Sequence, residues 1–432
     1  MSNTADSIKH STKKSRIKES VISVRLFEYL LLFSILTLTW NGLQDNFTNL
    51  TYLFIVIYAF SLRSKIHRSV KLKYLRPLIA SIIVSTFVAI LLGQDKQENL
   101  NLLENQYFSS TRIITSQISI YSPGVDLIPA FKWCVALVSL PFVVQVLKRT
   151  NLLLLKRATN VWIYGLMINI VVQIMQFFQL TNTGILTNLQ FNLSNSRFPG
   201  LASHPNALAI SVCLTIPLVF MPLISMPKIK RIIVVGMMIF SIYITESRAG
   251  LIVLALTLSS IIILTKDFGK IRISKLITVI MVIAFAFGLG FLAKIISLTR
   301  LSNQNTSAKA SNSERLQLLE YGWNAFLDYP ITGAGAVNLK VSHNIFLQVL
   351  SSIGIVGFIC FLVFMIQLIT TKADTLFYEK LPLIVFLLFG IFNNSLSDFY
   401  LYFPIGFAYS LSLPQLNKNG PTSQTLFVSK YS

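Results

Sequence analysis

The feature that most constrains this chain is a series of twelve hydrophobic stretches, most of them near the length that crosses a bilayer. They lie at residues 24–40, 47–62, 77–93, 125–147, 160–181, 201–225, 232–245, 249–265, 276–294, 343–370, 381–395 and 399–413. A membrane helix needs roughly 20 mostly apolar residues, and helices satisfy their own backbone polar groups in lipid. The sequence therefore predicts an all-α integral membrane protein with about twelve transmembrane helices.

Positive charge alternates between the two sets of loops that these stretches define. The first tail, counted to residue 25, and every second connection, together with the last tail, hold 27 of the 37 Lys and Arg residues, and the opposite loops hold 8. Because cytoplasmic loops are enriched in Lys and Arg, residues 1–23 and 414–432 are predicted to be cytoplasmic tails that flank a membrane domain at 24–413. The net charge of +21 then reflects topology, and it does not indicate nucleic-acid binding.

Composition narrows the possible chemistry. Only 12% of the residues are charged, about half the share of a soluble domain. The three cysteines lie inside apolar stretches without a paired spacing, so neither a disulfide framework nor a zinc site is predicted. The outer loops hold no DxD pair. We therefore expect no metal and no cofactor, because Mg²⁺ is normally held by carboxylates together with substrate phosphates.

The long outer loop at 295–342 contains the pattern of a short amphipathic helix between the ninth and tenth spans. Ser311 followed by Glu314 has the spacing of a capping box, which places Arg315 at the start of this helix. Apolar residues then recur at helical spacing, at Leu316, Leu319, Trp323 and Phe326. The pattern predicts a helix on the membrane surface that ends before Pro330 and leads through a tight glycine loop to His343.

Few basic groups lie next to the predicted spans, or at the start of the surface helix, on the outer face. They are Arg197, His204, Arg248, Arg315 and His343. Arginine can donate two parallel hydrogen bonds to phosphate oxygens. Histidine is a good general base near neutral pH. Nearby arginine charges should lower the pKa of His343 and keep its ring neutral. Such a group suits a lipid-linked diphosphate as the leaving group and a base-activated hydroxyl as the nucleophile.

Each of these residues also has a purely structural interpretation. An arginine at the end of a span can snorkel to lipid head groups, and Arg315 can pair with Glu314 or Glu320. His204 favours a structural role. Asn206 and Asn344 can either cap helices or position the base, and the residues alone leave both open. Gly354 and Gly357 are expected to allow close helix packing.

The run Ser342-His343-Asn344, with Gly354 and Gly357 after it, resembles the signature of the bacterial O-antigen ligase and O-antigen polymerase superfamily. Further stretches resemble the family's pattern in the same order: Arg197-Phe198-Pro199-Gly200 with Pro205-Asn206, then Ser247-Arg248-Ala249-Gly250, then Arg315 leading through Trp323, Pro330, Gly333 and Gly335 into His343. The resemblance covers about residues 160–413.

The resemblance implies a membrane glycosyltransferase that moves a glycan from polyprenyl diphosphate onto an acceptor sugar hydroxyl at the outer, periplasmic side of the bacterial inner membrane. It implies His343 and Arg315 as catalytic residues and Arg197, Arg248 and Arg315 as diphosphate ligands. The acceptor is either a lipid-anchored sugar or a growing chain, so ligase and polymerase stay open. Glu246 departs from the pattern, since an acid there can pair with Arg248 and divert it from phosphate.

Two other classes of function fit part of the same pattern. A transporter or flippase for a lipid-linked saccharide would share the spans and the basic groups, but would place its charges on broken helices in the middle of the membrane. A non-catalytic scaffold for envelope assembly would tolerate replacement of the outer Arg and His residues. The candidate Arg and His residues of this chain lie in or beside the predicted outer loops, which favours the transferase.

Overall fold

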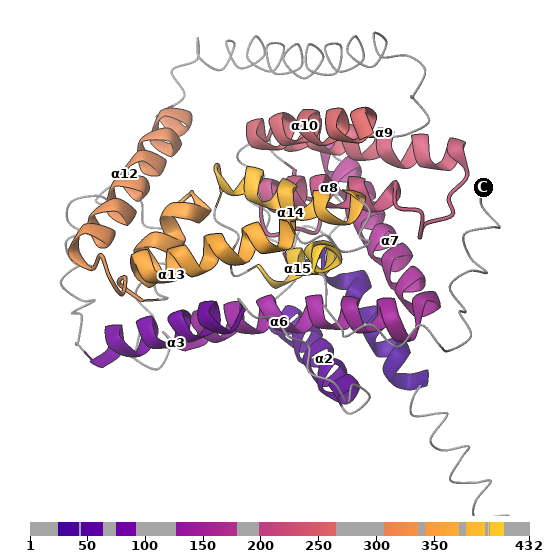
Figure 1. The fold of residues 1–432 in the computed structure, drawn as a ribbon. Coiled ribbons are helices and arrows are strands. Elements are labelled where there is room, and N and C mark those ends of the chain that lie inside the picture. Colours follow the sequence, from indigo (N-terminus) through magenta and orange to yellow (C-terminus); the bar gives the residue numbers. More distant parts are fainter. Residues whose placement is uncertain are drawn as a thin grey trace, which may run out of the picture.

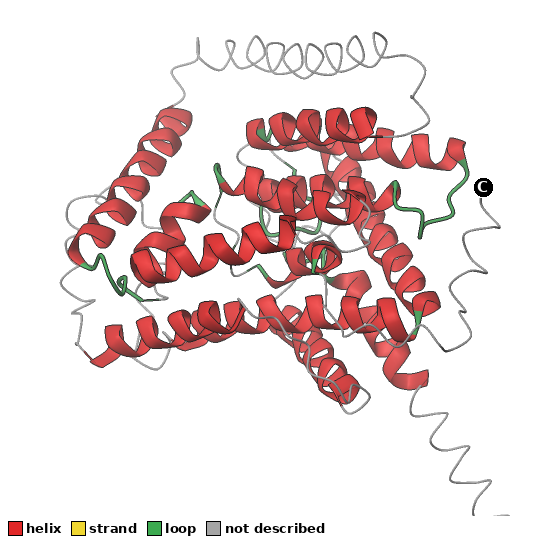
Figure 2. Ribbon diagram, viewed as in Figure 1, coloured by secondary structure: helices red, strands yellow, loops and turns green. Residues whose placement is uncertain are grey.

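The computed structural model of this protein describes residues 25–42, 45–63, 75–91, 127–178, 198–264, 306–335, 342–370, 377–393, 396 and 398–409. Within these ranges the regular secondary structure is helical and contains no strand (Figure 2). The predicted all-α class is therefore confirmed for the part of the chain that the structure describes.

The helices follow the predicted hydrophobic stretches. After a helix at 25–37 come α2 (Asp45–Arg63), α3 (Leu75–Leu91), α6 (Leu127–Thr150), α7 (Leu152–Phe177), α8 (Pro205–Val219), α9 (Lys228–Thr245), α10 (Arg248–Leu264), α12 (Thr306–Asp328), α13 (Ile345–Thr370), α14 (Phe377–Gly390), η4 (Phe399–Leu401), α15 (Tyr402–Ile405) and η5 (Gly406–Ala408) (Figure 1). The predicted stretch 276–294 lies outside the described residues, and each of the others coincides with helical structure.

Three of the described helices are long and apolar enough to cross a membrane. They are Ala130–Thr150, Leu152–Phe177 and Ile345–Thr370. Other apolar helices are shorter, such as the 15-residue α8, which at 1.5 Å per residue rises only about 22 Å against a hydrocarbon core of about 30 Å. The apolar helices support a membrane protein, and the twelve-span topology stays a prediction.

Helix α8 forms the centre of the fold. All of its residues except Asn206 are buried, and α7, α9, α10 and α14 pack around it (Figure 1). A helix that is apolar on all sides is stable only where other elements surround it. The hydroxyl of Thr215 accepts a hydrogen bond from the indole Nε1 of Trp162 on α7 at 2.8 Å, so these two buried polar groups are paired with each other.

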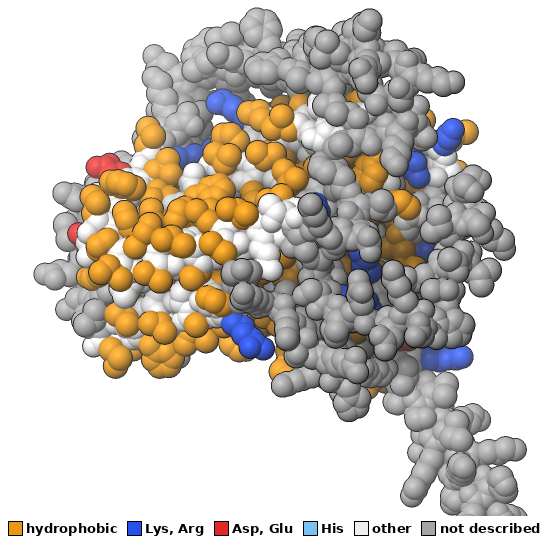
Figure 3. All heavy atoms as spheres, viewed as in Figure 1, with side chains coloured by type: hydrophobic (Ala, Val, Ile, Leu, Met, Phe, Trp, Pro, Cys, Tyr) orange, Lys and Arg blue, Asp and Glu red, His pale blue; other side chains and the backbone are white. Residues whose placement is uncertain are grey.

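Helices α3 and α13 pack against each other at one side of the molecule. Their outward faces expose large apolar side chains, at Ile83, Val84 and Phe87 on α3 and at Ile355, Val356, Ile359 and Ile366 on α13. Figure 3 shows this face as a nearly continuous hydrophobic surface with Lys and Arg toward its margins. An exposed apolar surface of this extent marks a site of membrane or protein contact.

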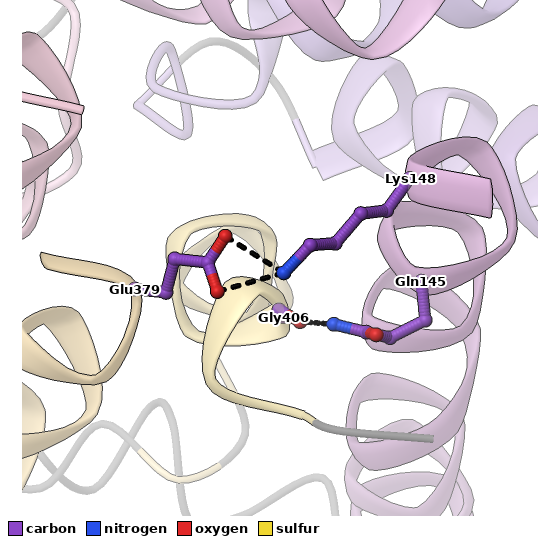
Figure 4. A network of polar contacts seen from close by, with 4 residues as sticks. All are labelled: Gln145, Lys148, Glu379 and Gly406. Carbon is purple, nitrogen blue, oxygen red and sulfur yellow. Dashed lines mark hydrogen bonds and ion pairs between the residues drawn. The ribbon is translucent and has the colours of Figure 1, made fainter. Parts of the chain in front are cut away.

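An ion pair joins α6 to α14. The Nζ of Lys148 donates to both carboxylate oxygens of Glu379 at 2.7 Å. One turn earlier on α6, the Nε2 of Gln145 donates to the carbonyl of Gly406 at 2.8 Å. Figure 4 shows the side chains of Lys148 and Gln145 extending from α6 toward Glu379 and Gly406. These contacts fix the C-terminal helices on α6, and both charged residues belong to loops that the sequence predicts to be cytoplasmic.

Candidate functional site

His343 lies immediately before α13, and its neighbour Asn344 fixes the start of that helix. The side-chain oxygen of Asn344 accepts hydrogen bonds from the backbone N–H groups of Phe346 at 2.9 Å and Leu347 at 3.0 Å. Its side-chain amide donates to the carbonyl of Ile391 at 3.1 Å, just after α14. Asn344 is therefore an N-cap that also ties two helices together, and its role in positioning the base stays a prediction.

Helix α12 begins earlier than the sequence pattern predicts. It starts at Thr306, so Ser311 and Glu314 lie inside the helix and Arg315 lies in its third turn. The expectation that Arg315 stands at a helix N-terminus is wrong, and free N-terminal amides do not contribute beside it. The capping-box spacing from Ser311 to Glu314 gave the wrong start because the residues before Ser311 are also helical, although several of them have a weak helix propensity.

Helix α12 packs on the start of α13 through a glycine. A Cβ atom built on Gly322 would lie 3.2 Å from the Cβ of Ser342 and 3.3 Å from the side chain of Leu347. Leu318 and Ala325 are buried on the same side of the helix. The close approach at Gly322 brings the body of α12 against the residues on both sides of His343.

The apolar stripe predicted on α12 divides between two sides of the helix. Leu316 and Trp323 are exposed, whereas Leu319 and Phe326 are half-buried. The buried side is instead formed by Leu318, Gly322 and Ala325. An exposed apolar side is what a helix at a lipid surface would present, so the surface location of α12 stays a prediction that this pattern favours.

Two features of the structure lower the pKa of His343. Burial of the imidazole lowers the pKa of His343 below its ordinary value, and the positive charge of Arg315 lowers it further. Both effects disfavour the imidazolium. The ring is therefore neutral near pH 7 and available to accept a proton, as the sequence analysis expected from an arginine nearby. Arg315 is therefore near enough for its charge to act on His343.

Arg248 is exposed at the first position of α10. The turn before it is tight, because Glu246 ends α9 in the left-handed region with a φ of 51°. A Cβ on Gly250 would lie 3.0 Å from Ala209 of α8, so α10 and α8 begin at the same end of the bundle. That Arg248 joins Arg315 and His343 in one site stays a prediction.

His204 forms the N-cap of α8. Its Nδ1 accepts a hydrogen bond from the backbone N–H of Asn206 at 3.2 Å, and Pro205 occupies the first helical position. This is the structural role that the sequence favoured for His204. The predicted supporting roles of His204 and Asn206 in chemistry stay predictions.

Arg197 lies outside the described residues, but the segment that follows it is held by three side-chain amides of α7. Gln173 Nε2 donates to the carbonyl of Phe198 at 2.9 Å. Gln176 donates to the carbonyl of Gly200 at 3.0 Å and accepts from its N–H at 2.8 Å. Asn169 accepts from the N–H of Leu201 at 2.7 Å. All three amides are buried.

Sequence reasoning missed these amides, although a signal for them was present. Asn169, Gln173 and Gln176 are spaced four and three residues apart, so they share one face of a helix within the apolar stretch 160–181. Buried amides need hydrogen-bond partners, and the backbone at 198–201 supplies them. The missing information was which segment would lie against that face.

No cluster that could hold a metal is found within the described ranges, where no three His, Cys, Asp or Glu side chains gather. The three cysteines, Cys134, Cys213 and Cys360, are all free thiols.

Comparison with known proteins gives a family match over part of the chain. Residues 233–362 match the family model described as O-Antigen ligase, a narrower range than the 160–413 that the motifs predict. The matched residues include Arg248, Arg315, His343 and Gly354, and exclude Arg197 and His204. Among curated proteins, no relative matches the chain. A domain of this family implies a ligase or polymerase of the glycosyltransferase type. Residues 233–362 of this chain are thus similar to the O-antigen ligase family, and this match supports the O-antigen ligase and polymerase superfamily.

Proposed function

We propose that this protein transfers a glycan from a polyprenyl-diphosphate donor to a sugar hydroxyl of an acceptor, at the outer face of the cytoplasmic membrane of a bacterium. The proposed topology has about twelve spans in a membrane domain at 24–413, with the tails 1–23 and 414–432 in the cytoplasm. Helix α12, from the outer loop 295–342, covers a lateral opening through which the lipid-linked donor enters from the bilayer.

One observation carries this proposal. Within the region that matches the ligase family, Arg315 lies close enough to His343 to lower the pKa of a half-buried imidazole. A neutral imidazole accepts a proton, and an arginine next to it binds phosphate oxygens. Displacement of a diphosphate by a hydroxyl requires a base and a phosphate-binding group within reach of the same substrate.

In the proposed mechanism, His343 removes the proton of the acceptor hydroxyl as its oxygen attacks the anomeric carbon of the donor glycan. The new glycosidic C–O bond forms while the bond to the diphosphate oxygen breaks. Polyprenyl diphosphate leaves with the electron pair, and Arg315, Arg248 and Arg197 offset its charge. The proton on His343 then passes to solvent. No metal or nucleotide takes part in these steps.

The supporting residues act through position. Asn344 holds the start of α13, and so the backbone of His343, against the end of α14. His204 and Asn206 order the start of α8, which lies beside the start of α10, where Arg248 is found. None of the three needs to contact the substrate for this role.

Reconstitution in proteoliposomes tests the proposal. The purified protein is given a labelled lipid-linked glycan and an acceptor saccharide, and products are separated by chain length and attachment. We expect glycan transfer by the parent protein and none by His343→Ala, with both proteins equally folded and inserted. Near-normal transfer by His343→Ala would contradict the role of His343 as the base. Movement of the donor between leaflets without transfer would indicate a flippase instead.

A deletion strain separates ligase from polymerase. If the acceptor is a growing chain, the strain retains surface glycan with a single repeat and loses long chains. If the acceptor is a lipid-anchored core, the strain loses all attached glycan and accumulates lipid-linked polymer. An unchanged surface glycan contradicts both forms of the proposal.

A further inference from the structure

Helix α13 contains a break at Gly354 that the sequence pattern did not predict. Gly354 has a φ of 66° and a ψ of −175°, far from helical values. The expectation that it allows two helices to pack closely is wrong. A Cβ atom at this position would lie 2.1 Å from the carbonyl oxygen of Ile331. Gly354 therefore lies against the loop that follows α12.

That loop replaces the helical hydrogen bonds that the break removes. In an uninterrupted helix, the N–H of Ile355 would donate to Ser351. Here Ile355 donates to the carbonyl of Pro330 at 2.9 Å, and the carbonyl of Ser351 accepts from Ala334 at 2.8 Å. The next carbonyl, of Ser352, accepts from Gly335 at 3.0 Å. We call residues 330–335 and 351–355, joined in this way, the backbone clasp.

Two further glycines make the clasp possible. Gly333 and Gly335 have φ values of 73° and 87°, which residues with a Cβ rarely adopt. A Cβ on Gly333 would lie 2.4–2.5 Å from the backbone of Ser352, Ile353 and Gly354. The two segments of the clasp thus contact each other through their backbones. A side chain larger than hydrogen at Gly333 or Gly354 would collide with the opposite segment.

Helix α3 contributes a third contact. The hydroxyl of Ser85 donates to the carbonyl of Ser352 at 2.7 Å, and this bond is buried. A Cβ on Gly335 would lie 2.7 Å from the Cβ of Ala89 on α3. The clasp is therefore anchored to a helix that belongs to neither of the two segments that it joins.

The clasp lies at the end toward which both α12 and the first part of α13 run. Upstream of it, α12 contacts the start of α13 at Gly322, next to Ser342 and Leu347. The two segments are thus parallel and are joined at two levels. Arg315 lies about two turns before Gly322 on α12, and His343 lies just before α13.

We propose that the backbone clasp, anchored by Ser85 of α3, is a positioning device that holds Arg315 of α12 against His343 of α13. Gly333, Gly354 and Ser85 are positioning residues, and none of them touches the reacting groups. The consequence for glycan transfer rests on the proposed function, whereas the geometry can be tested without any substrate.

The test measures the pKa of His343 directly. The chain has only four histidines, so histidine-labelled protein in nanodiscs gives few NMR titrations, and His343→Gln assigns one of them. Arg315 is the charge that lowers this pKa. The other titratable residues of α12 are Lys309, Glu314, Glu320, Tyr321 and Asp328. The charged residues of α3 and α14 lie in the first turns of those helices.

We expect Ser85→Ala and Gly333→Ala each to raise the pKa of His343, by about 0.5 or more, as Arg315 moves away. Ser81→Ala is the matched control for the first, because the Ser81 hydroxyl donates to Leu78 of its own helix. Gly236→Ala is the control for the second, since a Cβ there meets nothing within 4 Å. In an Arg315→Gln background, neither clasp variant should raise the pKa further.

An unchanged pKa in folded Ser85→Ala and folded Gly333→Ala overturns the proposal. If Gly333→Ala does not fold, Ser85→Ala alone decides the outcome. A rise of the same size in the Arg315→Gln background also overturns it, because the effect would then not act through Arg315. If the parent protein transfers no glycan, the proposed function fails, but these titrations still decide the role of the clasp.

Discussion

Arg315 and His343 come from different helical segments, and the charge of the first lowers the pKa of the second. Burial of the ring is the larger cause and the arginine adds to it. This relationship links the fold to the proposed chemistry, because it keeps the base neutral at the point where a phosphate-binding group is also present.

The acidic limb of the pH–rate profile should depend on Arg315. In the parent protein, transfer should be lost only as the pH falls below the ordinary histidine range, because His343 then becomes protonated. Arg315→Gln removes a positive charge, so the apparent pKa of this limb should rise. Arg315→Lys keeps the charge and should leave the limb near its original place while it lowers the rate. An acidic limb that is the same in all three proteins contradicts the assignment.

His343 should also make stability depend on pH. Its pKa is lower in the folded protein than the ordinary value of 6.5, so the unfolded chain binds more protons as the pH falls below that value. The contribution of His343 to stability is therefore complete above pH 6.5 and is lost as the pH falls through the lowered pKa. Thermal unfolding in detergent at several pH values should show a smaller acid loss for His343→Gln than for the parent.

Asn344 can be tested for its two separate contacts. Asn344→Ala removes the cap of α13 and the bond to Ile391, and should cost about 1–2 kcal/mol of unfolding free energy. Asn344→Asp keeps an oxygen that caps the helix but loses the donor to the Ile391 carbonyl. We expect its unfolding temperature to lie between those of the parent and Asn344→Ala. If Asn344→Asp is no more stable than Asn344→Ala, the cap contributes little.

Gly200 should be among the least replaceable residues before α8. Its φ is 64°, and a Cβ would lie 2.2 Å from the side-chain oxygen of Asn169. Gly200→Ala should therefore lower stability by about 2 kcal/mol or more. Gly236→Ala on α9, in open space, should change stability little, or raise it by up to about 1 kcal/mol. Equal unfolding temperatures for the two variants would contradict the geometry at Gly200.

Local patterns in the sequence predicted the elements well where apolar runs were long. The helices at 130–150, 152–177 and 345–370 follow hydrophobic stretches that are visible without a structure. The start of α12 was predicted wrongly, because a capping-box spacing is a local signal and the residues before Ser311 extend the helix anyway. Gly354 was misread for a related reason: a glycine in an apolar run looks the same whether it packs a helix or breaks one.

By itself, the sequence determined that this chain is helical and membrane-embedded, and which few ionisable residues could carry chemistry, because hydropathy and charge are properties of consecutive residues. Only the tertiary structure decided that Arg315 approaches His343, that Asn344 joins α13 to α14, and that the loop after α12 enters the break in α13. Each of these is a contact between segments far apart in the chain. Such contacts depend on how helices pack, and no local pattern encodes which partner a buried amide or a bare backbone will meet.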